Sequence, residues 1–276
     1  NVMITFSLVS GGTSVAALFM AGYIPGILWG LACMIVIYIF AMKKGYKSTS
    51  SFKGKEKLMV IWQALPSLLM IVIVIGGIIG GIFTATEGSV VAVVYTLILS
   101  LFFYKTIKFK DLPEIFLASA EMTGIIVFLI GVSSIMSWVM AFTDIPTLVS
   151  NALLGISNNK YVIFFIINII LLIVGTFMDM TPATLIFTPI FLPICQQLGM
   201  NVIHFGIMMI FNLCIGTITP PVGTTLFVGV KVGGTTIEKV IKPLLWYFAA
   251  IFAVLMLVTY VPQISLWLPG VMGYIK

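Results

Sequence analysis

The fold is decided between Gly175 and Gly223, where the sequence reads GTFMDMTPATLIFTPIFLPICQQLGMNVIHFGIMMIFNLCIGTITPPVG. Two apolar runs in this stretch are each interrupted by a short polar break rich in glycine and proline, at 175–182 and 216–223. Irregular backbone is tolerated at membrane depth only where it is buried in protein or lines a wet cavity. Broken helices that meet near the midplane form the ion and substrate sites of secondary transporters. The two breaks therefore predict a transport site.

The composition places the chain in a membrane. It has 276 residues, of which 61% are hydrophobic and 8% are charged, whereas soluble domains carry roughly 25% charged residues. This balance is typical of an all-α polytopic membrane protein surrounded by the lipid bilayer. The 14 basic residues are all lysines, and most flank apolar runs. The net charge of +6 therefore reflects membrane topology and does not indicate nucleic-acid binding.

Lysine clusters orient the predicted spans. Six lysines lie within 43–57, three within 105–110 and three within 231–242. Because lysine-rich short loops stay on the cytoplasmic side, all three clusters are predicted to be cytoplasmic. The segment 144–159 is then an outer polar connection, and 262–276 is an outer interfacial tail. The predicted apolar spans are 16–42, 58–83, 90–104, 117–142 and 244–261.

The first break separates two short arms, Tyr161–Val174 and Thr184–Leu198. Arms of about 15 residues reach ~22 Å at 1.5 Å per residue, whereas the hydrocarbon core is ~30 Å thick. The tip between them carries Asp179 and no lysine, which is unusual for a cytoplasmic loop. We therefore predict a re-entrant helical hairpin over about 160–199, entered from outside, and then a broken helix over about 202–231.

Asp179 is the only acid between Asp144 and Glu238. A charge at membrane depth costs about 2.5–3.5 kcal/mol on insertion scales, so a cation or several hydrogen-bond donors are expected beside it. One interpretation is a Na⁺ site shared by the two breaks; the other is a helix cap on the second arm, and the two can coexist. The predicted Na⁺ ligands are Gly175, Asp179, Thr181, Gly216, Thr217 and Thr219.

The second break contains Pro220 and Pro221, which remove two N–H donors and forbid regular helix. This frees carbonyl oxygens upstream, and such oxygens suit a hard cation. The helix that restarts after Pro221 points its positive N-terminus at the break, which favours an anion such as a carboxylate. The alternative is a proline kink in a packed span. The predicted substrate-binding residues are Thr181, Pro220, Gly223 and Thr224.

The remaining polar residues are given structural roles. Glu87, in the sequence TATEG, is predicted to cap the helix that follows it, and His204 is predicted to pack at an interface. The cysteines lie in apolar segments without C-x-x-C spacing and are predicted to be packing residues. The chain offers no nucleophile–base or metal constellation for an enzyme. Two unlike breaks fit an ion channel poorly.

Four stretches resemble the large membrane subunit of tripartite ATP-independent periplasmic (TRAP) transporters: LFMAGYIPGILWG, GGIIGGIFTATEGSVVAVVY, GTFMDMTPATLIFTPIFLPI and HFGIMMIFNLCIGTITPPVGTTLFVG. They follow the family's order over nearly the whole chain. The resemblance implies Na⁺-coupled uptake of an organic acid, delivered by a periplasmic binding protein, in the bacterial cytoplasmic (inner) membrane. It also implies an elevator-type fold of two inverted repeats, a small membrane subunit, separate or fused, and no organic cofactor.

By the same resemblance, residues 1–57 are the end of the first inverted repeat and a cytoplasmic lysine-rich loop, and residues 58–276 are the second repeat. Half of the ion and substrate site would then lie in a missing N-terminal part of the subunit. The family transports C4-dicarboxylates, sialic acids and other sugar or keto acids. The sequence does not decide among them, and sialic acid is our working choice. The rival interpretations are an ion-coupled carboxylate transporter without a binding protein and a non-transporting membrane scaffold.

Overall fold

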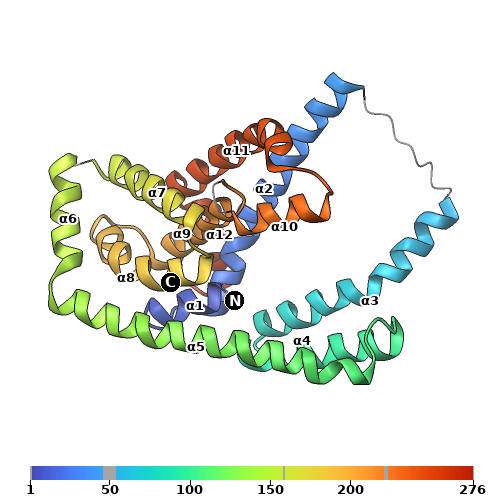
Figure 1. The fold of residues 1–276 in the computed structure, drawn as a ribbon. Helices are drawn as coiled ribbons and strands as arrows, with labels where there is room; N and C mark the ends of the chain where they lie inside the picture. The colour runs from blue at the N-terminus through green and yellow to red at the C-terminus, as the bar shows by residue number, and fades with distance from the viewer. Residues whose placement is uncertain (1, 46–53, 158, 221–222, 276) are drawn as a thin grey trace. The chain divides into compact units, whose positions relative to one another are not determined.

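The computed structural model describes residues 2–45, 54–157, 159–220 and 223–275, and every regular element in them is a helix (Figure 1). The predicted all-α fold is therefore confirmed for these residues. The helices form two compact units. The large unit comprises residues 1–44 and 129–276, and the small unit comprises residues 45–128. These units reflect packing, so the predicted division into two sequence repeats stays a prediction.

Several helices have the length and composition needed to cross a membrane. Among the described residues, four helices are long and apolar enough: Val15–Lys43, Ala85–Phe103, Lys160–Phe177 and Ile237–Tyr260. Many of their large apolar side chains are exposed, including Ile37 and Leu257. Exposed apolar surface on long helices is expected of a protein whose solvent is lipid. The structure therefore fits the predicted multi-pass membrane protein.

The small unit is built on the helix pair α3 (Gly54–Ile79) and α4 (Ala85–Ile98). The predicted cap at Glu87 is confirmed, because the Glu87 N–H donates to Thr84 Oγ1 at 3.3 Å while the Thr84 N–H donates to the Glu87 carboxylate at 2.7 Å. The α4 helix continues into the π-helix η1 (Leu99–Phe103). It is followed by the 3-10 helix η2 (Phe109–Asp111) and by α5 (Leu112–Phe142), which runs on into the large unit.

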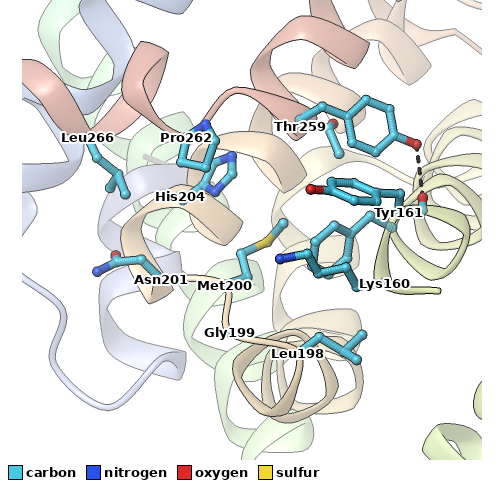
Figure 2. Close-up of a pocket in the computed structure, with 12 residues that line it drawn as sticks. Lys160, Tyr161, Leu198, Gly199, Met200, Asn201, His204, Thr259, Pro262 and Leu266 are labelled. Carbon is cyan, nitrogen blue, oxygen red and sulfur yellow. Dashed lines mark hydrogen bonds between the residues drawn. The ribbon is translucent and has the colours of Figure 1, made fainter. Parts of the chain in front are cut away.

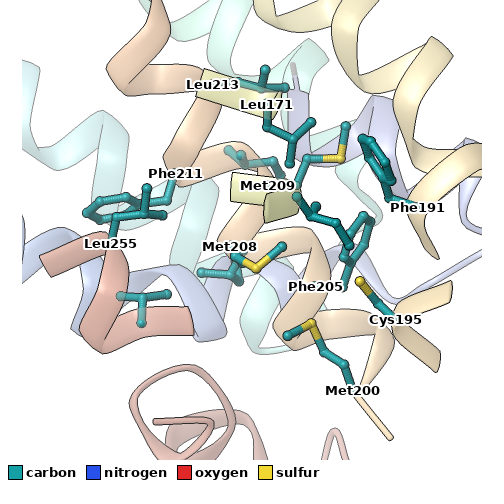
Figure 3. Close-up of a cluster of buried hydrophobic side chains, with 14 of the residues drawn as sticks. Leu171, Phe191, Cys195, Met200, Phe205, Met208, Met209, Phe211, Leu213 and Leu255 are labelled. Carbon is teal, nitrogen blue, oxygen red and sulfur yellow. The ribbon is translucent and has the colours of Figure 1, made fainter. Parts of the chain in front are cut away.

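The large unit is organised around α9 (Val202–Thr217), in which every side chain from Ile203 to Leu213 is buried. A helix that is apolar all round needs partners on every side. The partners of α9 include α7 (Lys160–Phe177), α8 (Met180–Gln197) and α11 (Ile237–Tyr260). Figure 3 shows Phe205, Met208, Met209 and Leu213 in the resulting core. Other helices in contact with α9 are α1 (Val2–Val9), α2 (Val15–Lys44), α10 (Thr224–Val232) and α12 (Gln263–Val271).

Two segments that were predicted to lie outside the spans contain short helices. The predicted polar connection 144–159 contains α6 (Ile145–Ile156), which packs against α8. Its sequence is IPTLVSNALLGI, and Val149 is the described residue of this helix that packs, half-buried, against the core. The predicted interfacial tail contains α12, which packs against α2 and buries Ser265 and Pro269, while Trp267 stays exposed.

Candidate functional site

The first break is much shorter than the sequence predicted. Helix α7 continues through Phe177, and α8 begins at Met180, so only Met178 and Asp179 are non-helical. Gly175 lies in the last turn of α7. Pro182 is the third residue of α8, where a backbone N–H has no intrahelical partner, so a proline fits without breaking the helix. The predicted break 175–182 was therefore too wide, because this proline starts a helix.

The second break lies between the end of α9 at Thr217 and the start of α10 at Thr224. Residues 221 and 222 are outside the described residues. The last turn of α9 closes tightly, since the Thr219 N–H donates to the Gly216 carbonyl oxygen at 2.9 Å. Prolines stand four residues after Gly216 and after Thr217. Neither of these carbonyls can therefore receive the usual bond of an α-helix.

The last turns of α7 and α9 meet where Gly175 contacts Gly216. A Cβ atom added to Gly216 would lie 2.4–2.6 Å from the backbone C, Cα and O atoms of Gly175. A Cβ added to Gly175 would lie 3.1 Å from Gly216 Cα. Small residues let helix backbones approach this closely inside membranes. The structure thus brings together one predicted site residue from each break.

Backbone carbonyl oxygens lie close to two positions that a side chain would otherwise fill. The Gly175 oxygen is 2.6 Å from the vacant Cβ position of Gly216. The oxygens of Thr219 and Thr217 are 2.8 and 3.2 Å from the vacant Cβ position of Gly223, whose φ is +21°. A side chain at Gly216 or at Gly223 would therefore collide with these backbone oxygens.

The threonine hydroxyls of the second break donate their protons to their own helix. Thr217 Oγ1 donates to the Cys214 carbonyl at 2.8 Å, and Thr219 Oγ1 donates to the Ile215 carbonyl at 2.6 Å. A hydroxyl that has committed its proton in this way presents only lone pairs to other neighbours. Both oxygens are therefore available as acceptors or as cation ligands.

The other predicted site residues follow this contact in the sequence, and the described residues show no hydrogen bond from them to either glycine. Asp179 occupies the N-cap position of α8, and its exposed side chain makes no capping hydrogen bond there. Thr181, in the first turn of α8, and Pro220 are both half-buried. Thr224 is the first residue of α10, and its side chain lies outside the described part of the structure.

Sequence reasoning missed a polar cluster that lies deep between α7, α9 and α11. Asn168 and Asn212 are both 0% exposed and hydrogen-bonded to each other. Their signal in the sequence was two asparagines within apolar runs. His204, predicted to be a packing residue, is buried against α11, where its Nε2 atom is 2.7 Å from the Val258 carbonyl oxygen. Of the three cysteines, none is in a disulfide, and Cys195 lies in the core.

A cavity of about 180 Å³ lies at the opposite ends of α7 and α9 from the breaks (Figure 2). Lys160, His204 and Thr259 contribute to its lining, and the Tyr260 hydroxyl donates to the Tyr161 carbonyl at 3.0 Å beside it. The start of α7 and the start of α9 both border this cavity. It is therefore separate from the two breaks, which lie at the far ends of the same helices.

The chain is similar to known proteins over nearly its whole length. The family model of the tripartite ATP-independent periplasmic transporter, DctM component, matches residues 1–264. An uncharacterized protein of Salmonella typhimurium, YgiK, is 53% identical over 98% of this chain and 62% of its own length. The C4-dicarboxylate TRAP transporter large permease protein DctM of Pseudomonas aeruginosa is 38% identical over 95% of this chain and 61% of its own length.

A third relative is the sialic acid TRAP transporter large permease protein SiaM of Vibrio cholerae. It is 34% identical over 99% of this chain and 64% of its own length. The chain therefore spans less than two thirds of the length of each of these curated relatives.

Proposed function

Because the chain belongs to the DctM component family of tripartite ATP-independent periplasmic transporters, we propose that it forms part of a Na⁺-coupled importer of an organic acid. The family is one of transport proteins and not of enzymes. The observation that carries the Na⁺ proposal is the contact between Gly175 and Gly216, which brings together the helix ends that precede the two breaks. Backbone oxygens at such helix ends suit a hard cation.

The proposed Na⁺ site takes oxygens from both sides of this contact. The carbonyl oxygens come from the glycines and from the residues that follow Gly216, and the hydroxyls come from threonines that have already donated their protons. Asp179 either joins the ligands or stabilises the tip electrostatically from its N-cap position. The full proposed set is Gly175, Asp179, Thr181, Gly216, Thr217 and Thr219.

The proposed carboxylate site lies at the N-terminus of α10. Unpaired N–H groups and the positive end of a helix favour an anion, and α10 begins directly after the second break. A cation on one side of the break and a carboxylate on the other would stabilise each other. The residues proposed to contact the substrate are Thr181, Pro220, Gly223 and Thr224.

We propose the partner proteins of this chain, and the membrane in which it lies, from its membership of the family. A periplasmic binding protein would deliver the substrate, and a small membrane subunit, separate or fused, would complete the transporter in the bacterial inner membrane. The remaining part of the large subunit would supply the rest of the first inverted repeat of an elevator-type fold. Permeases for C4-dicarboxylates and for sialic acid both align with nearly the whole chain, so a carboxylate is the proposed substrate class and sialic acid one candidate within it.

Uptake by the complete transporter tests this proposal. The large subunit and its small subunit would be reconstituted in proteoliposomes, and uptake of C4-dicarboxylates and of sialic acid would be followed with and without a Na⁺ gradient and the binding protein. We expect uptake only when both are present. Na⁺-driven uptake without a binding protein would favour the simpler carboxylate transporter, and no uptake under any condition would favour the membrane scaffold.

The orientation of the hairpin formed by α7 and α8 is a separate prediction. Each arm has 18 residues and spans ~27 Å at 1.5 Å per residue, slightly less than the ~30 Å hydrocarbon core. Phe177, at the tip, is 61% exposed. In a cysteine-free background, Phe177→Cys is expected to react with an impermeant thiol reagent from outside, whereas Lys43→Cys is expected to react from the cytoplasm. Labelling of Phe177→Cys from the cytoplasmic face alone, in every transport state, would show that the hairpin is not entered from outside.

A further inference from the structure

Two buried asparagines connect three helices of the large unit. The Asn212 side-chain amide, on α9, donates to both the backbone oxygen and Oδ1 of Asn168 on α7, each at 2.8 Å. The Asn168 amide in turn donates to the Phe164 carbonyl at 2.9 Å and to Thr259 Oγ1 of α11 at 3.1 Å. The hydrogen bonds therefore run in one direction from α9 through α7 to α11.

These bonds fix the orientation of the Asn212 amide. Reversing it would place its oxygen against two oxygens of Asn168, so the amide nitrogen must face Asn168. Its Oδ1 atom is then left buried without a hydrogen-bond partner in the described residues. An unsatisfied buried acceptor costs about 1–3 kcal/mol. Helical proteins tolerate a buried asparagine of this kind where it specifies how neighbouring helices align.

The asparagine pair lies close to the contact between the two breaks. Asn212 and Gly216 are four residues apart on α9, which is a rise of ~6 Å, or slightly more than one helical turn. Both face α7, Asn212 through its bonds to Asn168 and Gly216 through its contact with Gly175. The hydrogen bonds that the described residues make between α7 and α9 all come from the asparagine pair and its contact with Met208 Sδ.

We propose that Asn168 and Asn212 are positioning residues for the ion site, because they set the alignment of α7 along α9 that places Gly175 on Gly216. The two glycines have no side chains and cannot fix this alignment by directional bonds. The side-chain amides of Asn168 and Asn212 can, because they hydrogen-bond across the helix pair. The proposal rests on the proposed Na⁺ site at the breaks. The asparagines act through the helix pair, so their effect on Na⁺ is indirect.

The double variant Asn168→Leu/Asn212→Leu tests the proposal in the complete transporter. Replacing both hydrogen-bond partners by apolar groups is close to neutral for stability, so we expect a Tm near that of the parent. Removing residues that orient ligands typically lowers metal affinity by about 10–100-fold. We therefore expect the half-saturating Na⁺ concentration for uptake to rise about 10-fold. The single variant Asn168→Leu is expected to lower Tm, because it leaves the Asn212 amide without its Oδ1 partner.

Thr188→Val is the matched control. Thr188 is 0% exposed, lies on α8 and donates to Met209 Sδ on α9 at 3.5 Å. Its replacement also removes a buried polar contact to α9, and it leaves the pairing of α7 with α9 intact. We expect it to leave the half-saturating Na⁺ concentration unchanged.

A cross-linking measurement reads the alignment of the helices without relying on Na⁺. Thr176→Cys and Thr217→Cys directly follow the two contacting glycines, and in a cysteine-free background they are expected to form a cross-link. In the double leucine variant the yield of this cross-link should fall markedly. Parent-like cross-linking together with parent-like Na⁺ dependence would overturn the positioning role. If uptake by the parent itself does not depend on Na⁺, the proposed function fails, while the cross-link still decides whether the asparagines align the helices.

Discussion

Gly216→Ala is expected to abolish most Na⁺-dependent uptake by the complete transporter. The added Cβ would lie 2.4–2.6 Å from three backbone atoms of Gly175, and no side-chain rotation can relieve such a contact. Overpacking of this kind costs about 3 kcal/mol, which corresponds to about 100-fold in affinity. We therefore expect the half-saturating Na⁺ concentration to rise about 100-fold, because α7 and α9 must separate at the proposed ion site.

Two further glycine variants test whether the loss of Na⁺ affinity depends on how closely the added Cβ approaches its neighbours. Gly175→Ala places its Cβ 3.1 Å from Gly216 Cα and 3.4 Å from a Leu213 methyl carbon, a tight contact that small shifts can relieve, so a weaker loss is expected. Gly26→Ala, in α2, meets nothing within 4 Å and should leave uptake unchanged. Initial uptake rates over a series of Na⁺ concentrations, with membrane insertion measured in parallel, would compare the three. A parent-like Na⁺ response in Gly216→Ala would mean that the ion does not bind where the breaks touch.

Thr219→Val is expected to raise the half-saturating Na⁺ concentration about 10-fold. The variant keeps the branched shape and removes one hydroxyl oxygen that is proposed to ligate the cation. A loss of about 1.4 kcal/mol of binding free energy corresponds to tenfold in affinity. The Ile215 carbonyl that accepts from this hydroxyl also accepts from the Ile218 N–H at 3.2 Å. The substitution therefore leaves no backbone acceptor unpaired, and membrane insertion and Tm should change little.

Asp179→Asn distinguishes the two roles predicted for the acid at the hairpin tip. Asn is as good an N-cap residue as Asp, so a capping role predicts no change in Na⁺ dependence, whereas a role in cation binding predicts a higher half-saturating concentration. We expect the higher value. Thr176→Val is the control, since its hydroxyl donates to the Ile173 carbonyl at 2.7 Å in the same manner but is not a proposed ligand. If Thr219→Val and Asp179→Asn both retain the parent's half-saturating Na⁺ concentration and steepness, the ions bind elsewhere, and the breaks are structural kinks.

The sequence by itself determined the class of the protein and the location of its two breaks. Hydrophobic content and lysine clusters are properties of the chain alone, and they indicate a polytopic membrane protein in any fold. Paired prolines with flanking glycines exclude regular helix locally, so the interruption around Pro220 could be predicted without a structure. The capping box at Glu87 is equally local, because its partner Thr84 lies three residues away.

Only the tertiary structure decided which residues of the two breaks meet. The contact of Gly175 with Gly216, and the bonds of Asn168 to Asn212, join positions about 40 residues apart in sequence, and such contacts depend on how helices pack. The short length of the first break, between α7 and α8, also depends on tertiary packing. Glycine and proline are common both at helix ends and in loops. Their presence at Gly175 and Pro182 therefore could not show that α7 runs to Phe177 and that α8 begins at Met180. Local sequence limits where a helix can end, but the packing of α7 and α8 against α9 sets where each one does.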